Sequence, residues 1–245
     1  MICGDCGEEG AWQSTCEACG NDPLLDGRYR LESIVGRGAN GVTYRAVRVA
    51  DERVVAIKEL PFHRIDELKA LKLFEREAKV LRQLDHPQIP EHVDDFVTGK
   101  GRHRSMYLVQ SFIEGQTLEA ERTSRRYSEP EVLEIVAEVA DLLDYLHSLR
   151  PPVVHRDIKP GNLMRRPDGT LVLVDFGAVQ DAVRDAKMGG STTVGTYGYM
   201  APEQYSGNTT PASDLYALGM TMAVLLTRQP AQVLCPVPGQ VDWQR

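Results

Sequence analysis

Short runs of apolar and β-branched residues fill much of the first half of the chain and predict β-strands. Three such runs cover residues 28–35, 42–49 and 54–58, and the first roughly alternates apolar with polar side chains. Two later runs, 93–97 and 106–109, flank a basic, glycine-containing turn and indicate a hairpin. Strands therefore dominate the chain as far as about residue 110.

Helical spacing of apolar residues appears in three later stretches, at 71–84, at 128–149 and from 213 to about 227. The first stretch places four apolar residues on one face: Phe74, Ala78, Leu81 and Leu84. The second begins with Ser128 and Glu131, which have the spacing of a capping box. The pattern thus predicts mainly helices after residue 110.

Glu77 lies within the apolar face of the first of these helices. A carboxylate held against a core is costly unless a cation meets it. Lys58 ends the third strand, where it shares one side with Ala56 while Val55 and Ile57 share the other. We therefore expect a Lys58–Glu77 pair; the alternative is an edge glutamate whose side chain bends out into water.

Length and composition fit a soluble globular chain of one or two domains, with 245 residues, 42% hydrophobic and 26% charged. The net charge of −7 gives no support for nucleic-acid binding. No basic segment followed by an apolar one suggests a signal peptide, and the apolar stretch 217–226 is too short to span a bilayer. We expect a cytoplasmic chain without a membrane segment.

Four cysteines occur within the first twenty residues in the spacing C-x2-C-x9-C-x2-C: Cys3, Cys6, Cys16 and Cys19. Two-residue spacing lets both thiolates of a pair bind one tetrahedral ion. We expect a zinc-ribbon-like segment over 1–22 with a structural Zn²⁺, followed by a short turn-rich linker over 21–27. The alternatives are two disulfides, which a reducing cytoplasm disfavours, or free thiols.

Gly36, Gly38 and Gly41 form a G-x-G-x-x-G motif between the first two predicted strands. Glycine lets backbone N–H groups approach phosphate oxygens without an intervening side chain. A dinucleotide-binding version of this motif would lead into a helix, whereas a strand follows here. The motif therefore indicates a loop that covers phosphates between two strands.

The strongest chemical signal is the stretch 154–162, which contains Asp157, Lys159 and Asn162. One short loop therefore presents a base, a cation and a metal ligand. Asp175 lies eighteen residues after Asp157, between an apolar run and Phe176-Gly177. A carboxylate at such a strand end can bind a hard cation.

Together these motifs resemble those of bacterial Hanks-type (eukaryotic-like) Ser/Thr protein kinases, over about residues 28–235. The resemblance implies an α+β, bilobal fold preceded by the small zinc ribbon. The N-lobe, an antiparallel β-sheet with one helix, would span 28–110, with a hinge at 111–113. A mainly helical C-lobe would span 114–245 and lack its last helices.

The resemblance also implies that the chain transfers the ATP γ-phosphoryl group to a Ser or Thr hydroxyl of protein substrates. Such a kinase would act in signalling and would also phosphorylate itself. Asp157 would accept the hydroxyl proton, and Lys159 would stabilise the moving phosphoryl group. Asn162 and Asp175 would hold Mg²⁺, or Mn²⁺ in its place. The implied nucleotide contacts are Val35, Gly36, Gly38, Gly41, Thr43, Ala56, Lys58, Glu77, Phe112 and Met164.

The sequence departs from the family pattern at Thr43, where Val is usual, and at Gln110 and Ser111, beside the expected adenine site. Regulation is expected in the segment that follows Asp175. Ser191, Thr192 and Thr193 are candidates for autophosphorylation, with Arg156 as a phosphate partner. Thr196 would instead have a structural role near Asp157 and Lys159.

The end of the chain leads to the expectation of a fragment or truncated gene product. Glu203 would then lack the arginine that normally pairs with it. Several apolar residues would not all be covered: Leu218, Met222, Val224, Leu225 and Leu226.

Two rival hypotheses remain at this stage. One is an ATP-binding pseudokinase or inactive truncated scaffold, against which the complete set of catalytic residues argues. The other is a zinc-ribbon nucleic-acid module, which is disfavoured because residues 1–27 contain no Lys or Arg.

Overall fold

The computed structural model describes residues 1–11, 13–37, 41–61, 75, 77–98, 104–176, 180–181 and 195–242. The chain divides into two compact units. The N-terminal unit comprises Met1–Asp85 and Pro90–Ile113, and the C-terminal unit comprises His86–Ile89 and Glu114–Arg245. The four-Cys segment therefore belongs to the N-terminal unit.

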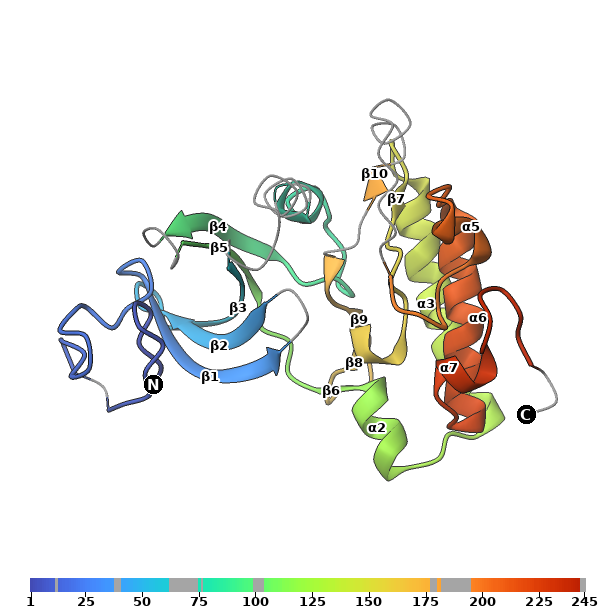
Figure 1. The fold of residues 1–245 in the computed structure, drawn as a ribbon, viewed down its shortest axis with the longest axis horizontal. Helices are drawn as coiled ribbons and strands as arrows, with labels where there is room; N and C mark the ends of the chain where they lie inside the picture. Colours follow the sequence, from blue (N-terminus) through green and yellow to red (C-terminus); the bar gives the residue numbers. More distant parts are fainter. Residues whose placement is uncertain are drawn as a thin grey trace. The chain divides into compact units, whose positions relative to one another are not determined.

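A five-stranded antiparallel sheet forms the N-terminal unit, in the order β1-β2-β3-β5-β4 (Figure 1). Its strands are β1 (Tyr29–Arg37), β2 (Val42–Arg48), β3 (Arg53–Pro61), β4 (His92–Thr98) and β5 (Ser105–Ser111). Each strand falls where the apolar pattern predicted one. Strands consecutive in the chain pair with each other except β3 and β4, because β5 lies between them and pairs with both.

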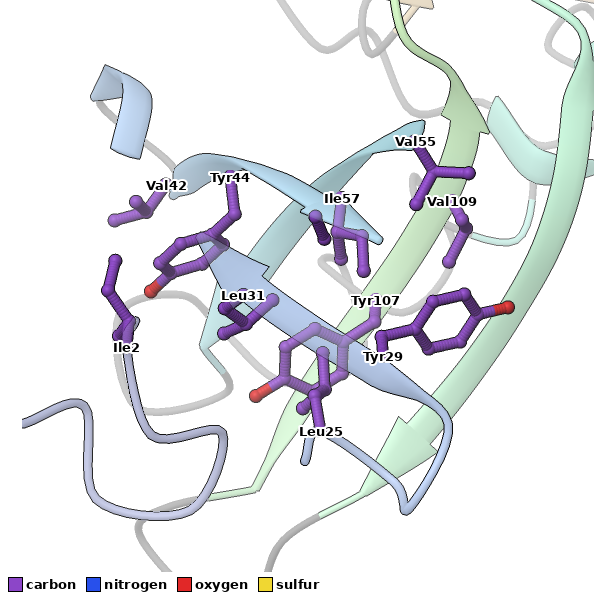
Figure 2. Packing of buried hydrophobic residues seen from close by; sticks show 11 residues of the cluster. Ile2, Leu25, Tyr29, Leu31, Val42, Tyr44, Val55, Ile57, Tyr107 and Val109 are labelled. Carbon is purple, nitrogen blue, oxygen red and sulfur yellow. The ribbon is translucent and has the colours of Figure 1, made fainter. Parts of the chain in front are cut away.

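The core of this sheet lies on the side of Val55 and Ile57, both fully buried. Alternation along β3 therefore directs Ala56 and Lys58 away from this core. Figure 2 shows the core cluster, in which the rings of Tyr29, Tyr44 and Tyr107 lie among aliphatic side chains.

The segment expected as a linker contributes to the same core. Leu25 is only 1% exposed and Ile2 only 4%, and both belong to the cluster around Tyr29 and Leu31. Backbone hydrogen bonds fix each of them, because the Ile2 amide donates to the Leu31 carbonyl and the Leu25 amide donates to that of Tyr29. The linker is therefore anchored to the sheet through Leu25, since an apolar side chain gains by leaving water.

Of the helix expected over 71–84, the structure describes residue 75 and residues 77–84, and these are helical at 75 and over 77–81. Ala78, Leu81 and Leu84 are buried, as the helical spacing predicted. Phe74 lies outside the described residues.

Helices dominate the C-terminal unit, which confirms the expected α+β class. Its two long helices are α3 (Glu129–Ser148) and α6 (Pro211–Thr227), and they pack on each other (Figure 1). Ser128 caps α3 in a complete capping box with Glu131, as predicted. The described chain also contains three short helices that the pattern did not predict: α2 (Leu118–Ser124), α5 (Pro202–Tyr205) and α7 (Ala231–Leu234).

Short strands complete this unit and position the site. They are β6 (Gln116–Thr117), β7 (Val153–Val154), β8 (Leu163–Arg165), β9 (Leu171–Leu173) and β10 (Gln180–Asp181). The strands β6, β8 and β9 form one sheet, and β7 pairs with β10. A 3-10 turn, η3 (Pro160–Asn162), lies between β7 and β8.

The five apolar side chains of α6 are not all covered, as expected. Leu218, Val224 and Leu225 are buried, Met222 is half-buried, and Leu226 is 43% exposed. Residues after Arg228 continue into α7, which begins directly after Pro230. No helix in the described part of the chain has both the length and the apolar character needed to cross a membrane.

Candidate active site

A buried carboxylate fixes the backbone of the loop that follows β7. Asp214, in the first turn of α6, accepts hydrogen bonds from the amides of His155 and Arg156 at 2.9 and 2.8 Å. His147, at the end of α3, contacts the same carboxylate through Nε2 at 2.9 Å. Arg156 has a φ of 72°, so these bonds hold the loop in a conformation that non-glycine residues rarely adopt.

Three side chains converge on the carboxylate of Asp157. Lys159 Nζ and Asn162 Nδ2 donate to Oδ2 at 2.7 and 2.9 Å. Thr196 donates its hydroxyl hydrogen bond to Oδ1 at 2.6 Å. Lys159 Nζ also donates to the Thr196 hydroxyl oxygen at 2.6 Å. The structure thus brings together four of the predicted site residues around one anionic group.

Asn162 and Asp175 each carry a side-chain oxygen that can bind a metal ion. The Asn162 amide nitrogen is engaged by the backbone and side chain of Asp157, so its oxygen is the acceptor that remains. The backbone amide of Val174 donates to the backbone carbonyl of Asn162 at 2.9 Å, which places the residue before Asp175 against the loop. An amide oxygen and an exposed carboxylate are ligands that Mg²⁺ prefers, so these residues fit the ion.

His155 lies fully buried beneath the loop, edge-on to the ring of Phe176 at 4.9 Å between centroids. Burial lowers the pKa of His155, although Asp214, Asp157 and Asp175 oppose this shift. The Asp157 amide donates to His155 Nδ1 at 3.3 Å, and Nε2 has no hydrogen-bond partner among the described residues. The imidazole is therefore a neutral packing group.

The segment that carries Thr196 is tied to the loop that carries Asp157. Gln204 donates to the Arg156 carbonyl at 3.2 Å and accepts from the Ala201 amide. A Cβ at Gly195, where φ is 140°, would lie 3.0 Å from the same Arg156 carbonyl and closer still to Met200. Sequence reasoning missed Gln204, since no spacing rule links it to a residue 48 positions away.

The N-terminal unit contains the expected ion pair. Lys58 Nζ lies 3.1 and 3.2 Å from the two carboxylate oxygens of Glu77, which is only 2% exposed. The partner of the buried carboxylate is thus the one that the helical pattern indicated. Ala56 and Thr43 are half-buried, and Thr43 lies opposite Lys58 in the β2–β3 register.

The glycine motif is described only in part, because Gly38 lies outside the described residues. Gly41 needs to be glycine for steric reasons, because a Cβ there would lie 1.9 Å from the Glu59 carbonyl oxygen. A Cβ at Gly36 would make only ordinary contact with Thr43. Val35 is exposed.

Two other predicted nucleotide contacts, Phe112 and Met164, come from later in the sequence than this motif. Phe112 is half-buried, with the Arg45 guanidinium 5.5 Å from its ring centroid. Met164 lies half-buried in β8 of the C-terminal unit. The predicted phosphorylation sites Ser191, Thr192 and Thr193 lie outside the described residues.

The four cysteines of the N-terminal segment form a compact cluster. Their sulfur atoms all lie within 4.8 Å of one another. The Cys3–Cys19 and Cys6–Cys16 sulfur pairs are 3.8 Å apart, far beyond a disulfide bond length of about 2.05 Å. Tetrahedral zinc with Zn–S bonds of about 2.3 Å would hold its sulfurs about 3.8 Å apart, so the donor set fits this ion. Backbone amides of Cys19 and Ala18 lower the pKa of Cys16 to about 7, whereas, against the effect of the Asn21 amide, desolvation and the neighbouring thiols raise the pKa of Cys19 to about 12.

This combination of a β-sheet unit, a Lys–Glu pair and a helix-anchored aspartate loop is that of a protein kinase domain. The sequence matches the protein kinase domain family over residues 29–233, so the chain belongs to this family.

The chain is also similar to bacterial proteins that are named serine/threonine-protein kinases. Serine/threonine-protein kinase B of Synechocystis sp. is 37% identical across 94% of this chain, and serine/threonine-protein kinase F of the same organism is 40% identical across 91%. Serine/threonine-protein kinase PknA of Nostoc sp. is 36% identical across 91%. The resemblance to bacterial Hanks-type kinases is thereby confirmed. The chain spans 42%, 48% and 42% of the lengths of these three relatives, which is less than half of each.

Proposed function

We propose that this chain transfers the γ-phosphoryl group of ATP to a Ser or Thr hydroxyl of protein substrates. The convergence of Lys159, Asn162 and Thr196 on the Asp157 carboxylate carries this proposal. A carboxylate held in this way can orient a substrate hydroxyl and accept its proton. Relatives across nearly the whole chain are named serine/threonine-protein kinases, which supports the same acceptor chemistry.

Each step can be assigned to a residue of this chain. The substrate oxygen attacks the γ-phosphorus, its proton passes to Asp157, and the bond between the γ-phosphorus and the bridging oxygen breaks to release ADP. Lys159 neutralises charge on the moving phosphoryl group. Lys58, held by Glu77, positions the phosphates of the nucleotide.

Asn162 and Asp175 are the residues proposed to hold Mg²⁺. When bound, this ion supplies positive charge that offsets the charge of the phosphate oxygens. Ser191, Thr192 and Thr193 stay proposed sites of autophosphorylation, and mass spectrometry after incubation with Mg-ATP tests them.

The function is tested by transfer of labelled phosphate from ATP to a generic protein substrate, followed by identification of the phosphorylated residue. We expect phosphoserine or phosphothreonine with the native chain and neither with Asp157→Asn. Tight ATP binding without any transfer would instead support the pseudokinase alternative.

We also propose that Cys3, Cys6, Cys16 and Cys19 hold one structural Zn²⁺. The sulfur spacing supports this assignment, and four thiolates leave no open position for catalysis. Metal analysis of freshly purified protein tests it. One zinc per chain is expected, and the absence of zinc together with free alkylation of all four thiols would contradict it.

A further inference from the structure

The four-Cys segment, taken together with its linker as residues 1–27, contributes two side chains to the hydrophobic core of the N-terminal sheet. Ile2 and Leu25 are buried in the same cluster as Leu31, Tyr44 and Tyr107, as Figure 2 shows. Each is also tied to β1 by a backbone bond, Ile2 to the Leu31 carbonyl at 2.9 Å and Leu25 to the Tyr29 carbonyl at 2.8 Å. The segment therefore covers part of a core that the sheet cannot close alone.

These two anchors lie on either side of the cysteine cluster in the sequence. Ile2 directly precedes Cys3, which is itself buried, and Leu25 follows Cys19 by six residues. The two halves also contact each other, because the Gly4 amide donates to the Pro23 carbonyl at 2.8 Å. A Cβ at Gly4 would lie 2.5 Å from the backbone of Leu25, so only glycine permits this approach. An ion that joins the four sulfurs would hold both anchors in place at once.

The covered core leads directly to the strand that carries Lys58. Ile57 precedes Lys58 and lies fully buried in the cluster. Glu59 follows Lys58, and its two carboxylate oxygens accept hydrogen bonds from the hydroxyls of Tyr44 and Tyr107 at 2.8 and 2.9 Å. Of the two residues that flank Lys58, Ile57 thus belongs to this cluster, and Glu59 is hydrogen-bonded to two tyrosines of it.

We propose that the four-Cys segment is a metal-dependent cap of the N-terminal sheet, in which the ion fixes Ile2 and Leu25 and thereby rigidifies β1 to β3. This inference rests on the proposed zinc site. A segment of about twenty residues cannot bury a core of its own, so metal binding supplies the order that presents the two anchors. The function of the cap is to position the strand of Lys58, and the metal is coupled to it through packing.

Hydrogen exchange of the full chain tests the coupling. Protein with one equivalent of Zn²⁺ is compared with protein stripped by a chelator, both under reducing conditions so that no disulfide forms. We expect metal removal to speed amide exchange at least tenfold in β1, β2 and β3 and to leave α3 and α6 of the C-terminal unit unchanged. Unchanged exchange in the three strands, with zinc shown to bind, would overturn the inference alone. Failure of the chain to bind zinc would overturn the zinc proposal and this inference with it.

Variants separate packing from metal binding. Leu25→Ala should still bind one zinc per chain, but zinc should no longer protect the three strands. Because coupling is reciprocal, the same variant should also bind Zn²⁺ at least tenfold more weakly in competition with a chromophoric chelator. Ile2→Ala is the second variant should Leu25→Ala fail to fold, and Leu133→Ala, at an exposed position of α3, is the matched control. Native zinc affinity in both Leu25→Ala and Ile2→Ala would contradict the proposed cap.

Discussion

Asp157 has both carboxylate oxygens engaged by donors from its own loop and from the segment around residue 196. Replacement by Asn keeps the volume and removes the proton acceptor. We expect Asp157→Asn to lower kcat by about 10²–10⁴-fold while ATP binding and thermal unfolding stay close to native. The measurement is single-turnover transfer alongside nucleotide titration.

Asp144→Asn, at an exposed position of α3, is the matched control and should behave as native. Retention of near-native turnover by Asp157→Asn would show that another group accepts the proton.

Thr196 offers a second test at the scale of a single residue. Its hydroxyl contacts both Asp157 and Lys159, so Thr196→Ala removes two hydrogen bonds to charged groups. A hydrogen bond to a charged group contributes roughly 1.5–3 kcal/mol, so we expect kcat to fall by about 10- to 100-fold. Thr196→Ser keeps the hydroxyl and should recover most of the rate. Equal loss in the Ala and Ser variants would indicate that the methyl group, and not the hydroxyl, matters.

Much of the residue-level chemistry could be predicted because it lies in one short loop. Asp157, Lys159 and Asn162 are separated by at most five positions, so their spacing constrains their geometry. The contacts of Asp214 have no local signal in the sequence, because they join positions 58 and 59 residues apart. His147 and Gln204 were not predicted as part of the site for the same reason.

Helix α3 shows how local sequence determines an element. Ser128 accepts from the Glu131 amide, and Glu131 accepts from the Ser128 amide at 2.7 Å. We expect Ser128→Ala to lower the free energy of unfolding by about 1 kcal/mol, measured by urea denaturation. Ser148→Ala is the control, because that hydroxyl only donates to the Tyr145 carbonyl at the other end of the helix. Equal effects of the two substitutions would contradict the capping role.

Elements with several periods of pattern were predicted well, and short ones were not. Strands β1 to β5 and helices α3 and α6 are long enough for their apolar spacing to be distinctive. The helices α5 and α7 have four residues each, which is about one turn and carries no periodicity. Burial of Leu25 was missed because a single apolar residue among turn-forming neighbours gives no signal of the surface it contacts.

The stability of the whole molecule should depend on His155 in mildly acidic solution. Burial lowers the pKa of this imidazole from its ordinary value of 6.5, so the unfolded chain takes up a proton that the folded chain excludes. The contribution to folding is therefore complete above pH 6.5 and is lost as the pH falls below it, by at most about 1.4 kcal/mol per pH unit.

Urea unfolding between pH 7.5 and 5.5, with the imidazole followed by NMR, tests this dependence. We expect His155 to titrate in the folded protein at a pH below its ordinary pKa of 6.5. Titration of His155 near pH 6.5 in the folded protein would contradict the expected burial effect.

The cluster drawn in Figure 2 has a practical consequence for anyone who trims this protein to a minimal catalytic fragment. The family match begins at Tyr29, which suggests a cut just before that residue. Such a cut would discard Ile2 and Leu25 and open the apolar surface of Leu31 and Tyr107 to water. Exposed surface of this kind promotes association between molecules. A fragment meant to keep the N-terminal unit intact should therefore retain residues 1–28, which precede β1.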